Sequence, residues 1–196
     1  MLTSVFSPEC RAKISPCSFS LVALLVSLAG CPGDDDGPDA NPADVMVELG
    51  GGAVDFQPLV GTTPDLVLEA GPQGGHHFIV NARMRGFIPG DPSMPGLLGN
   101  PATLFSAFTE DGSQIDLMFP PYRLGYQQDD DGFFYLPSGR ILQVDEDVVD
   151  SLIGQAVLLR VNVRDAQGLE SSDERMIIAT EPPPGTPDAG PLADGS

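Results

Sequence analysis

Strict alternation of apolar and polar residues in two stretches constrains the fold of this chain most. Residues 77–85 and residues 157–164 both repeat with a period of two. Because successive side chains of a β-strand point to opposite faces, this period predicts two half-buried strands. In the second stretch the alternating apolar residues are Val157, Leu159, Val161 and Val163. In the first, the residues expected to face a core are Phe78, Val80, Ala82 and Met84.

Shorter apolar segments elsewhere predict further strands. Turn signals such as Asp131-Gly132 separate them. Many short strands with regular turns indicate an antiparallel sandwich or barrel, so we expect one all-β domain over residues 45–180. Residues 145–153 are expected to form one short helix, which Asp145 or Asp147 caps. The other candidate strands are residues 45–49, 54–59, 65–70, 103–109, 115–119, 122–126, 133–136 and 141–144.

The end of this region has a more specific pattern. Residues 154–180 contain a long alternating strand, a D-x-x-G turn at Asp165–Gly168, and a polar stretch that leads into a final apolar strand. This pattern resembles the last two strands of immunoglobulin-like extracellular modules. The resemblance implies an immunoglobulin-like β-sandwich that acts as a binding module or as a spacer. The resemblance identifies no catalytic residues. The chain has no Trp, which excludes the Cys…Trp…Cys core of antibody domains, and an unrelated sandwich is the alternative.

The N-terminal segment has the order of features of an export signal. Arg11 and Lys13 precede an apolar run at residues 19–28, which is too short to span a bilayer as a helix. Small residues and Cys31 follow, in the sequence LAGC at residues 28–31. We therefore expect residues 1–30 to be a signal peptide. An ordinary secretory signal with an incidental cysteine is the alternative.

The sequence LAGC resembles the lipobox of bacterial lipoproteins. The resemblance implies that the chain is cut before Cys31, that the cysteine sulfur is diacylated, and that lipid holds the protein on a membrane of the bacterial cell envelope. In this family an Asp directly after the cysteine favours retention in the inner membrane. Pro32 stands at that position here, and the absence of Asp implies the outer membrane. Residues 31–44 and 181–196 contain Pro, Gly, Asp and small residues, and we expect a disordered linker and a disordered tail.

The net charge of −19 limits the classes of partner. No basic stripe is present to neutralise phosphates, so we expect no nucleic-acid binding. Cys10, Cys17 and Cys31 all precede the β domain, which is expected to lack disulfides and thiol chemistry. Phosphate-loop, zinc-protease and G-x-S-x-G motifs are absent. We therefore expect that the protein is not an enzyme. The alternative class is an envelope hydrolase with a dispersed active site.

Two local clusters are candidates for binding. His76 and His77 are adjacent on a predicted strand, so they point to opposite faces and are poorly placed to share a metal. Asp129, Asp130 and Asp131 precede Gly132 and are weak candidates for a calcium site. A hairpin tip, in which Asp-Gly supplies the positive φ, is the simpler interpretation. Calcium is the one cofactor that these residues suggest, and a calcium-stabilised adhesion module is the alternative function.

One long loop completes the candidates. Residues 86–99 are rich in Pro and Gly, and Phe87, Ile88 and Leu97 are expected to be exposed there. Long ordered loops often carry binding sites, and a sandwich corner is the alternative interpretation. The sequence thus predicts a lipid-anchored, non-enzymatic binding or structural module. An envelope protein or polysaccharide is the expected partner.

Overall fold

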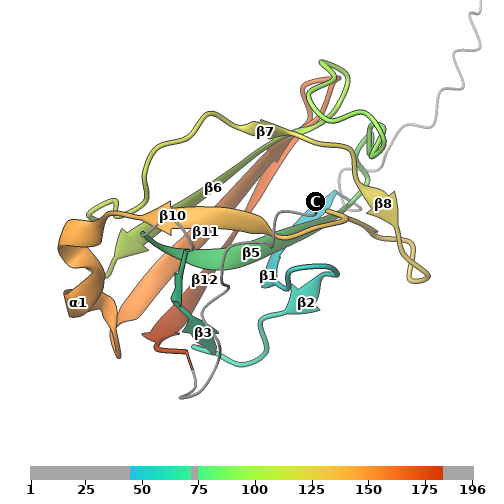
Figure 1. The fold of residues 1–196 in the computed structure, drawn as a ribbon. Helices are drawn as coiled ribbons and strands as arrows, with labels where there is room; N and C mark the ends of the chain where they lie inside the picture. Colours follow the sequence, from blue (N-terminus) through green and yellow to red (C-terminus); the bar gives the residue numbers. More distant parts are fainter. Residues whose placement is uncertain (1–44, 72–74, 183–196) are drawn as a thin grey trace, which may run out of the picture. The chain divides into compact units, whose positions relative to one another are not determined.

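The computed structural model describes residues 45–71 and 75–182, and these form an all-β sandwich of two sheets (Figure 1). The predicted fold class is thereby confirmed. Cys31, the residues of the predicted signal peptide and the C-terminal segment from residue 183 lie outside the described residues.

The first sheet is built around β5, which pairs on one edge with β1 and β4 and on the other with β9 and β10. All of these pairs are antiparallel. Its strands are β1 (Met46–Gly51), β2 (Gln57–Pro58), β4 (Glu69–Ala70), β5 (His76–Arg85), β8 (Gln127–Gln128), β9 (Phe134–Tyr135) and β10 (Arg140–Val144).

The second sheet has the order β3-β12-β11-β6-β7. Its strands are β3 (Asp65–Val67), β6 (Ala102–Thr109), β7 (Tyr122–Arg123), β11 (Ala156–Arg164) and β12 (Glu170–Thr180). The pair of β3 and β12 is parallel, in a sheet that is otherwise antiparallel. Six strands follow the pairing order of the immunoglobulin sandwich, with β1-β5-β10 in one sheet and β12-β11-β6 in the other.

The core lies between the two sheets and is formed by the alternating residues that the sequence indicates. Phe78, Val80, Ala82 and Met84 are fully buried, as predicted. Val157, Leu159, Val161 and Val163 from β11 are also fully buried. Because only one face of each strand meets the other sheet, the period of two in the sequence reports directly on the core.

The predicted short helix is confirmed between β10 and β11. It begins as a 3₁₀ turn, η2 (Glu146–Val148), and continues as α1 (Val149–Leu152). The Asp145 carboxylate accepts a hydrogen bond from the Asp147 backbone N–H at 3.1 Å, so Asp145 is the cap. Val149 and Leu152 are buried against the sandwich.

Several predicted strands differ from the structure. Residues 115–119 form no strand, because their backbone bonds alternate between the two sheets. Ile115 donates to Ala107 of β6, whereas Leu117 donates to Gln143 of β10. The candidates at 54–59, 122–126 and 133–136 shorten to two residues each, and β8 was not predicted.

Two burial expectations were wrong. Phe87, which was expected to be exposed in a loop, is 6% exposed and packs into the core. Asn81 lies among the residues that alternate with the core face, yet it is also fully buried. Its amide donates to the backbone carbonyls of Gly52 and Leu136, which cover this part of the outer face.

Candidate functional site

The two ends of the sandwich carry different kinds of surface, and Figure 1 shows them on opposite sides. We call the entry end the part where β1 begins, at Met46 paired with Arg85. The loop at 86–101 and the turns at 129–132 and 165–168 lie at this end. We call the helix end the part that contains η2, α1, the turn at 110–113 and the last residues of β12. The described chain thus enters at one end and carries its helix at the other.

A hollow of about 370 Å³ opens at the helix end. Its walls are mostly apolar, and Leu68 and Val149 are buried beneath it. His76, Asp150 and Glu181 bring an imidazole and two carboxylates to its lining. The remaining residues that line it are Ala70, Ile153 and Pro182. Hollows of this size with an apolar wall and a few polar groups are suited to binding a small group.

Glu146 holds His76 at the edge of this hollow. One carboxylate oxygen, Oε2, lies 3.0 Å from His76 Nδ1, and the other, Oε1, accepts from the His76 backbone N–H at 2.6 Å. Glu146 belongs to η2, so the helix and the first residue of β5 are tied together. The His76 ring is about one-third exposed and lies within the lining of the hollow.

His77 takes a different position, as expected for the next residue of a strand. Its side chain is nearly buried, and its Nε2 lies 4.0 Å from Glu69 Oε2 of β4. Burial lowers the pKa of His77, with the neighbouring His76 adding in the same direction and Glu69 opposing both. The two imidazoles therefore have separate carboxylate partners.

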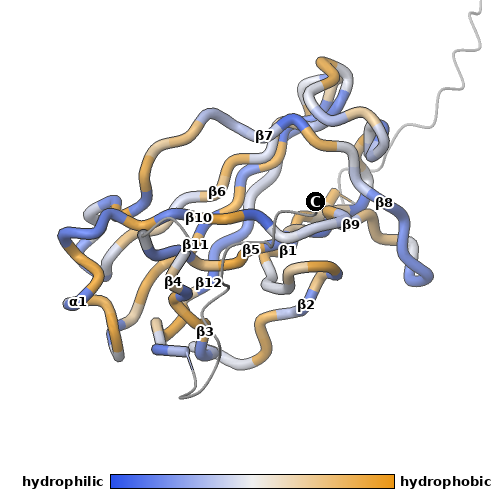
Figure 2. Tube along the Cα trace, viewed as in Figure 1, coloured by the Kyte–Doolittle hydropathy of each residue, from blue (hydrophilic) through white to orange (hydrophobic). Residues whose placement is uncertain are grey.

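Asp129, Asp130 and Asp131 lie at the tip of the β8–β9 hairpin, which Figure 2 shows as hydrophilic. Asp129 Oδ1 accepts from the backbone N–H groups of Asp131, at 3.0 Å, and Phe133, at 2.8 Å. Gly132 has a φ of 78°, the conformation that the Asp-Gly pair predicts. Within residues 45–71 and 75–182, no group of three His, Cys, Asp or Glu side chains is arranged to hold a metal ion.

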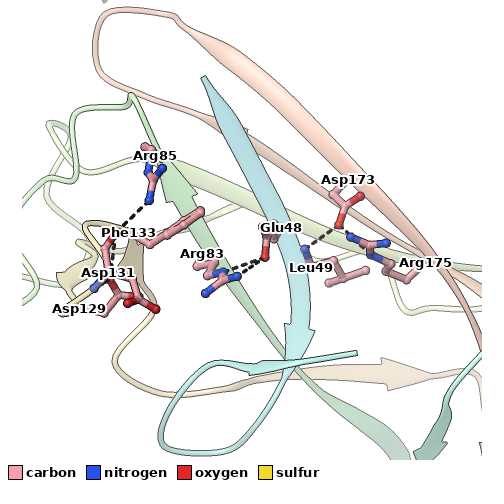
Figure 3. A network of polar contacts seen from close by, with 9 residues as sticks. All are labelled: Glu48, Leu49, Arg83, Arg85, Asp129, Asp131, Phe133, Asp173 and Arg175. Atoms are coloured by element: carbon pink, nitrogen blue, oxygen red, sulfur yellow. Dashed lines mark hydrogen bonds and ion pairs between the residues drawn. The ribbon is translucent and has the colours of Figure 1, made fainter. Parts of the chain in front are cut away.

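A stack of cations and rings occupies the outer face of the first sheet (Figure 3). The Arg83 guanidinium lies over Phe133 at 4.2 Å and over Phe56 at 4.8 Å from the ring centroids. The Arg85 guanidinium lies 4.0 Å from the Phe133 centroid and donates to the Asp131 carbonyl at 2.9 Å. Arg83 also pairs with Glu48 at 2.7 Å. This stack was not predicted from the sequence, in which the available signal was the pair Arg83 and Arg85, two positions apart at the end of a strand.

Exposed apolar side chains occur at several places, and two of them form groups. In the loop at 86–101, Ile88, Met94, Leu97 and Leu98 are 37%, 52%, 42% and 79% exposed. Along the side of the sandwich, Leu117, Phe119 and Ile141 line a slot between β6 and β10. The slot holds only about 10 Å³, because its own side chains fill it.

The predicted lipidation residue, Cys31, lies outside the described residues. Across the part of the chain that the structure describes, no helix is long and apolar enough to cross a membrane. Compared with models of known protein families and with curated proteins, the chain gives no match.

Proposed function

We propose that this protein is a bacterial lipoprotein, anchored through lipid on Cys31, whose β-sandwich is a non-enzymatic binding module of the cell envelope. The observation that carries this proposal is the placement of chain entry and hollow at opposite ends of one sandwich. An anchor upstream of Met46 tethers the sandwich to the membrane through its entry end, which leaves the helix end, with its hollow, free to reach other envelope components.

The proposal of a non-enzymatic role rests on what the polar side chains already do. Asp129, Asp165 and Asp173 each accept backbone N–H groups, and His76 is fixed by Glu146. Among the described residues, the lining of the hollow also contains no serine, threonine or cysteine that His76 could activate as a nucleophile. The chain has two histidines, and both have structural contacts.

The lining of the hollow supports a partner that combines an apolar group with hydrogen-bond donors. Its apolar wall accepts a small apolar group, and the carboxylates of Asp150 and Glu181 accept hydrogen bonds from donors on that group. A side chain of an envelope protein or a sugar of an envelope polysaccharide meets both requirements.

Lipidation is tested by Cys31→Ser in the full chain. The unaltered protein is expected to partition with membranes and to carry the mass of the acyl chains, and the variant is expected to lose both. A variant that stays on the membrane with an unchanged mass would contradict lipid anchoring.

The binding role is tested with a photo-crosslinking amino acid at Asp150, in the wall of the hollow, and at Asp130, an exposed residue of the entry-end hairpin, as the matched control. Discrete crosslinked species from the Asp150 position alone are expected in cells. Identical patterns from both positions would contradict a partner site at the helix end.

A calcium-stabilised adhesion module is the second candidate, because Asp130 and Asp131 are exposed beside Asp129 at one hairpin tip. Calorimetric melting with calcium and with a chelator separates the two candidates. A higher melting temperature with calcium, lost in Asp130→Asn, would favour the adhesion module. An unchanged melting temperature favours the plain turn.

A further inference from the structure

The loop at 86–101 holds apolar side chains out of the protein at the entry end. Leu98 is 79% exposed and Met94 is 52% exposed, although Phe87 of the same loop is buried in the core. Figure 2 shows hydrophobic colouring at this loop, on the side of the sandwich away from α1. The loop is therefore fixed to the core through Phe87 and carries exposed apolar side chains at its tip.

Internal hydrogen bonds fix the conformation of the tip. The fully buried Asn100 accepts from the Asp91 backbone N–H at 2.8 Å and donates to the Met94 carbonyl at 2.8 Å. Gly90 allows this close approach, because a Cβ there would collide with the Asn100 amide oxygen. Farther along, Gly96 donates to the Arg123 carbonyl at 2.8 Å. The apolar side chains are thus presented by a preformed structure, which lowers the entropic cost of binding.

The tip carries little charge in a strongly acidic chain. Asp91 is the one acidic residue among residues 86–101, and its carboxylate accepts from the backbone and side chain of Ser93. Arg123 lies beside the tip and donates to the Leu98 carbonyl at 3.4 Å. An apolar tip with a cation at its margin matches the interface of a bilayer, where acyl chains lie beneath headgroup phosphates.

The point at which the described chain begins favours a lipid bilayer as the partner of the tip. This step rests on the proposed lipidation of Cys31. The 14 residues of segment 31–44 reach at most about 50 Å when fully extended, so the entry end can lie against the bilayer that carries the anchor. Met46 begins β1 beside Arg85, and the loop follows Arg85 directly.

We propose that the tip of this loop, with Met94, Leu97 and Leu98, inserts into the interfacial region of the bilayer that carries the anchor. The insertion holds the sandwich with its entry end against the membrane and directs the hollow at the helix end away from it. The lipid on Cys31 then keeps the protein on the membrane, and the loop adds a second contact that sets the orientation of the sandwich.

The test uses the absence of Trp from the chain, since one introduced Trp is a clean reporter. The chain from Cys31 onward contains one thiol. Coupling this thiol to maleimide-bearing lipid in phosphatidylcholine vesicles anchors the protein at residue 31 without biological lipidation. Leu98→Trp reports on the tip and Met94→Trp is a second probe. Gln155→Trp, an exposed residue of the helix end, is the matched control.

Blue-shifted emission and quenching by brominated phosphatidylcholine are expected for Leu98→Trp and Met94→Trp, at least about twofold stronger than for Gln155→Trp. Equal quenching at both ends would overturn the proposal. A blue shift without quenching would also overturn it, by placing the tip against protein such as a second copy. Because the anchor is chemical, these outcomes are independent of the Cys31→Ser result.

Discussion

The carboxylate of Asp173 accepts a hydrogen bond from the backbone N–H of Leu49 at 2.9 Å, and this contact joins one sheet to the other (Figure 3). Leu49 belongs to β1, which pairs with β5, and Asp173 belongs to β12 of the second sheet. The same oxygen of Asp173 also accepts from Arg175 Nε at 3.1 Å. The Asp173 side chain thus gives the Leu49 N–H, at the edge of β1, the acceptor that a further strand would otherwise have to provide.

We expect Asp173→Ala to lower the free energy of unfolding by about 1–3 kcal/mol, because the partly buried Leu49 N–H loses its acceptor. Asp173→Asn retains an acceptor oxygen and is expected to lose less. Urea denaturation followed by circular dichroism measures both. The control is Glu174→Ala, which breaks the exposed pair with Arg160 and is expected to cost no more than about 1 kcal/mol. Equal losses at the two positions would contradict the role of Asp173.

The buried pair of Tyr126 and Thr103 predicts a loss of stability at alkaline pH. Their hydroxyl oxygens lie 2.7 Å apart, and burial raises the pKa of Tyr126 above its ordinary value of 10.0, against a smaller opposing effect of the Thr103 hydrogen bond. The unfolded chain releases this proton near pH 10 while the folded chain keeps it. Stability from this group is therefore complete below pH 10 and falls above it, by up to about 1.4 kcal/mol per pH unit.

Tyr126→Phe is expected to remove this alkaline slope. The variant is also expected to be less stable at pH 7 by about 1–2 kcal/mol, because the Thr103 hydroxyl is left buried without its partner. Urea unfolding at pH values between 8 and 11 measures the slope. A slope that is the same in both proteins would show that Tyr126 does not carry the effect.

The lowered pKa of His77 predicts a loss of stability at acidic pH. Since burial lowers the pKa of His77 below 6.5, the unfolded chain binds a proton that the folded chain does not. The stability that neutral His77 contributes is present above about pH 6.5 and is lost as the pH falls below it. His77→Gln should reduce this acid loss, whereas Glu69→Gln should increase it, because Glu69 raises the pKa of His77. Thermal melting between pH 7 and pH 5 tests both directions.

The sequence predicts those parts of the fold in which a pattern of residues repeats or closes over a few neighbouring positions. β5 and β11 were predicted because one face of each strand packs on the opposite sheet, so core residues recur at every second position. Burial itself alternates in β11, whereas in β5 His77 and Asn81 on the other face are buried as well. The predicted turn at Asp165–Gly168 is confirmed for a similar reason, since Asp165 Oδ1 accepts from the N–H groups of Gln167 and Leu169 within the turn itself. Both signals lie within a few residues along the chain.

Contacts between segments that are distant in the sequence leave no such local pattern. Residues 115–119 are mostly apolar, as a strand would be, but their backbone groups bond partly to β6 and partly to β10, which only the assembled sandwich determines. Phe87 was expected to be exposed because a Pro/Gly loop surrounds it, whereas the core accepts it. For the candidate site, the sequence indicated His76 but not Val149, Asp150 or Glu181, because separate elements bring them to the hollow.

The Arg83 stack allows a last prediction about the outer face of the first sheet. Arg83 and Glu48 are directly opposite in the ladder of β5 and β1, and both side chains are less than one-quarter exposed. Arg83→Leu is expected to cost about 1–3 kcal/mol, since it leaves Glu48 half-buried without its partner and removes the cation from Phe133 and Phe56. The exposed Arg160→Leu is the control.

Arg83→Lys separates charge from shape at this position. Lys keeps the positive charge but lacks the planar guanidinium, which both stacks on Phe133 and pairs with Glu48 at 2.7 Å. We therefore expect Lys to recover only part of the loss. A double-mutant cycle of Arg83→Leu with Phe133→Leu should give a coupling of about 0.5–1 kcal/mol in urea denaturation. Full recovery by Lys with no coupling to Phe133 would show that simple charge pairing with Glu48 accounts for the role of Arg83.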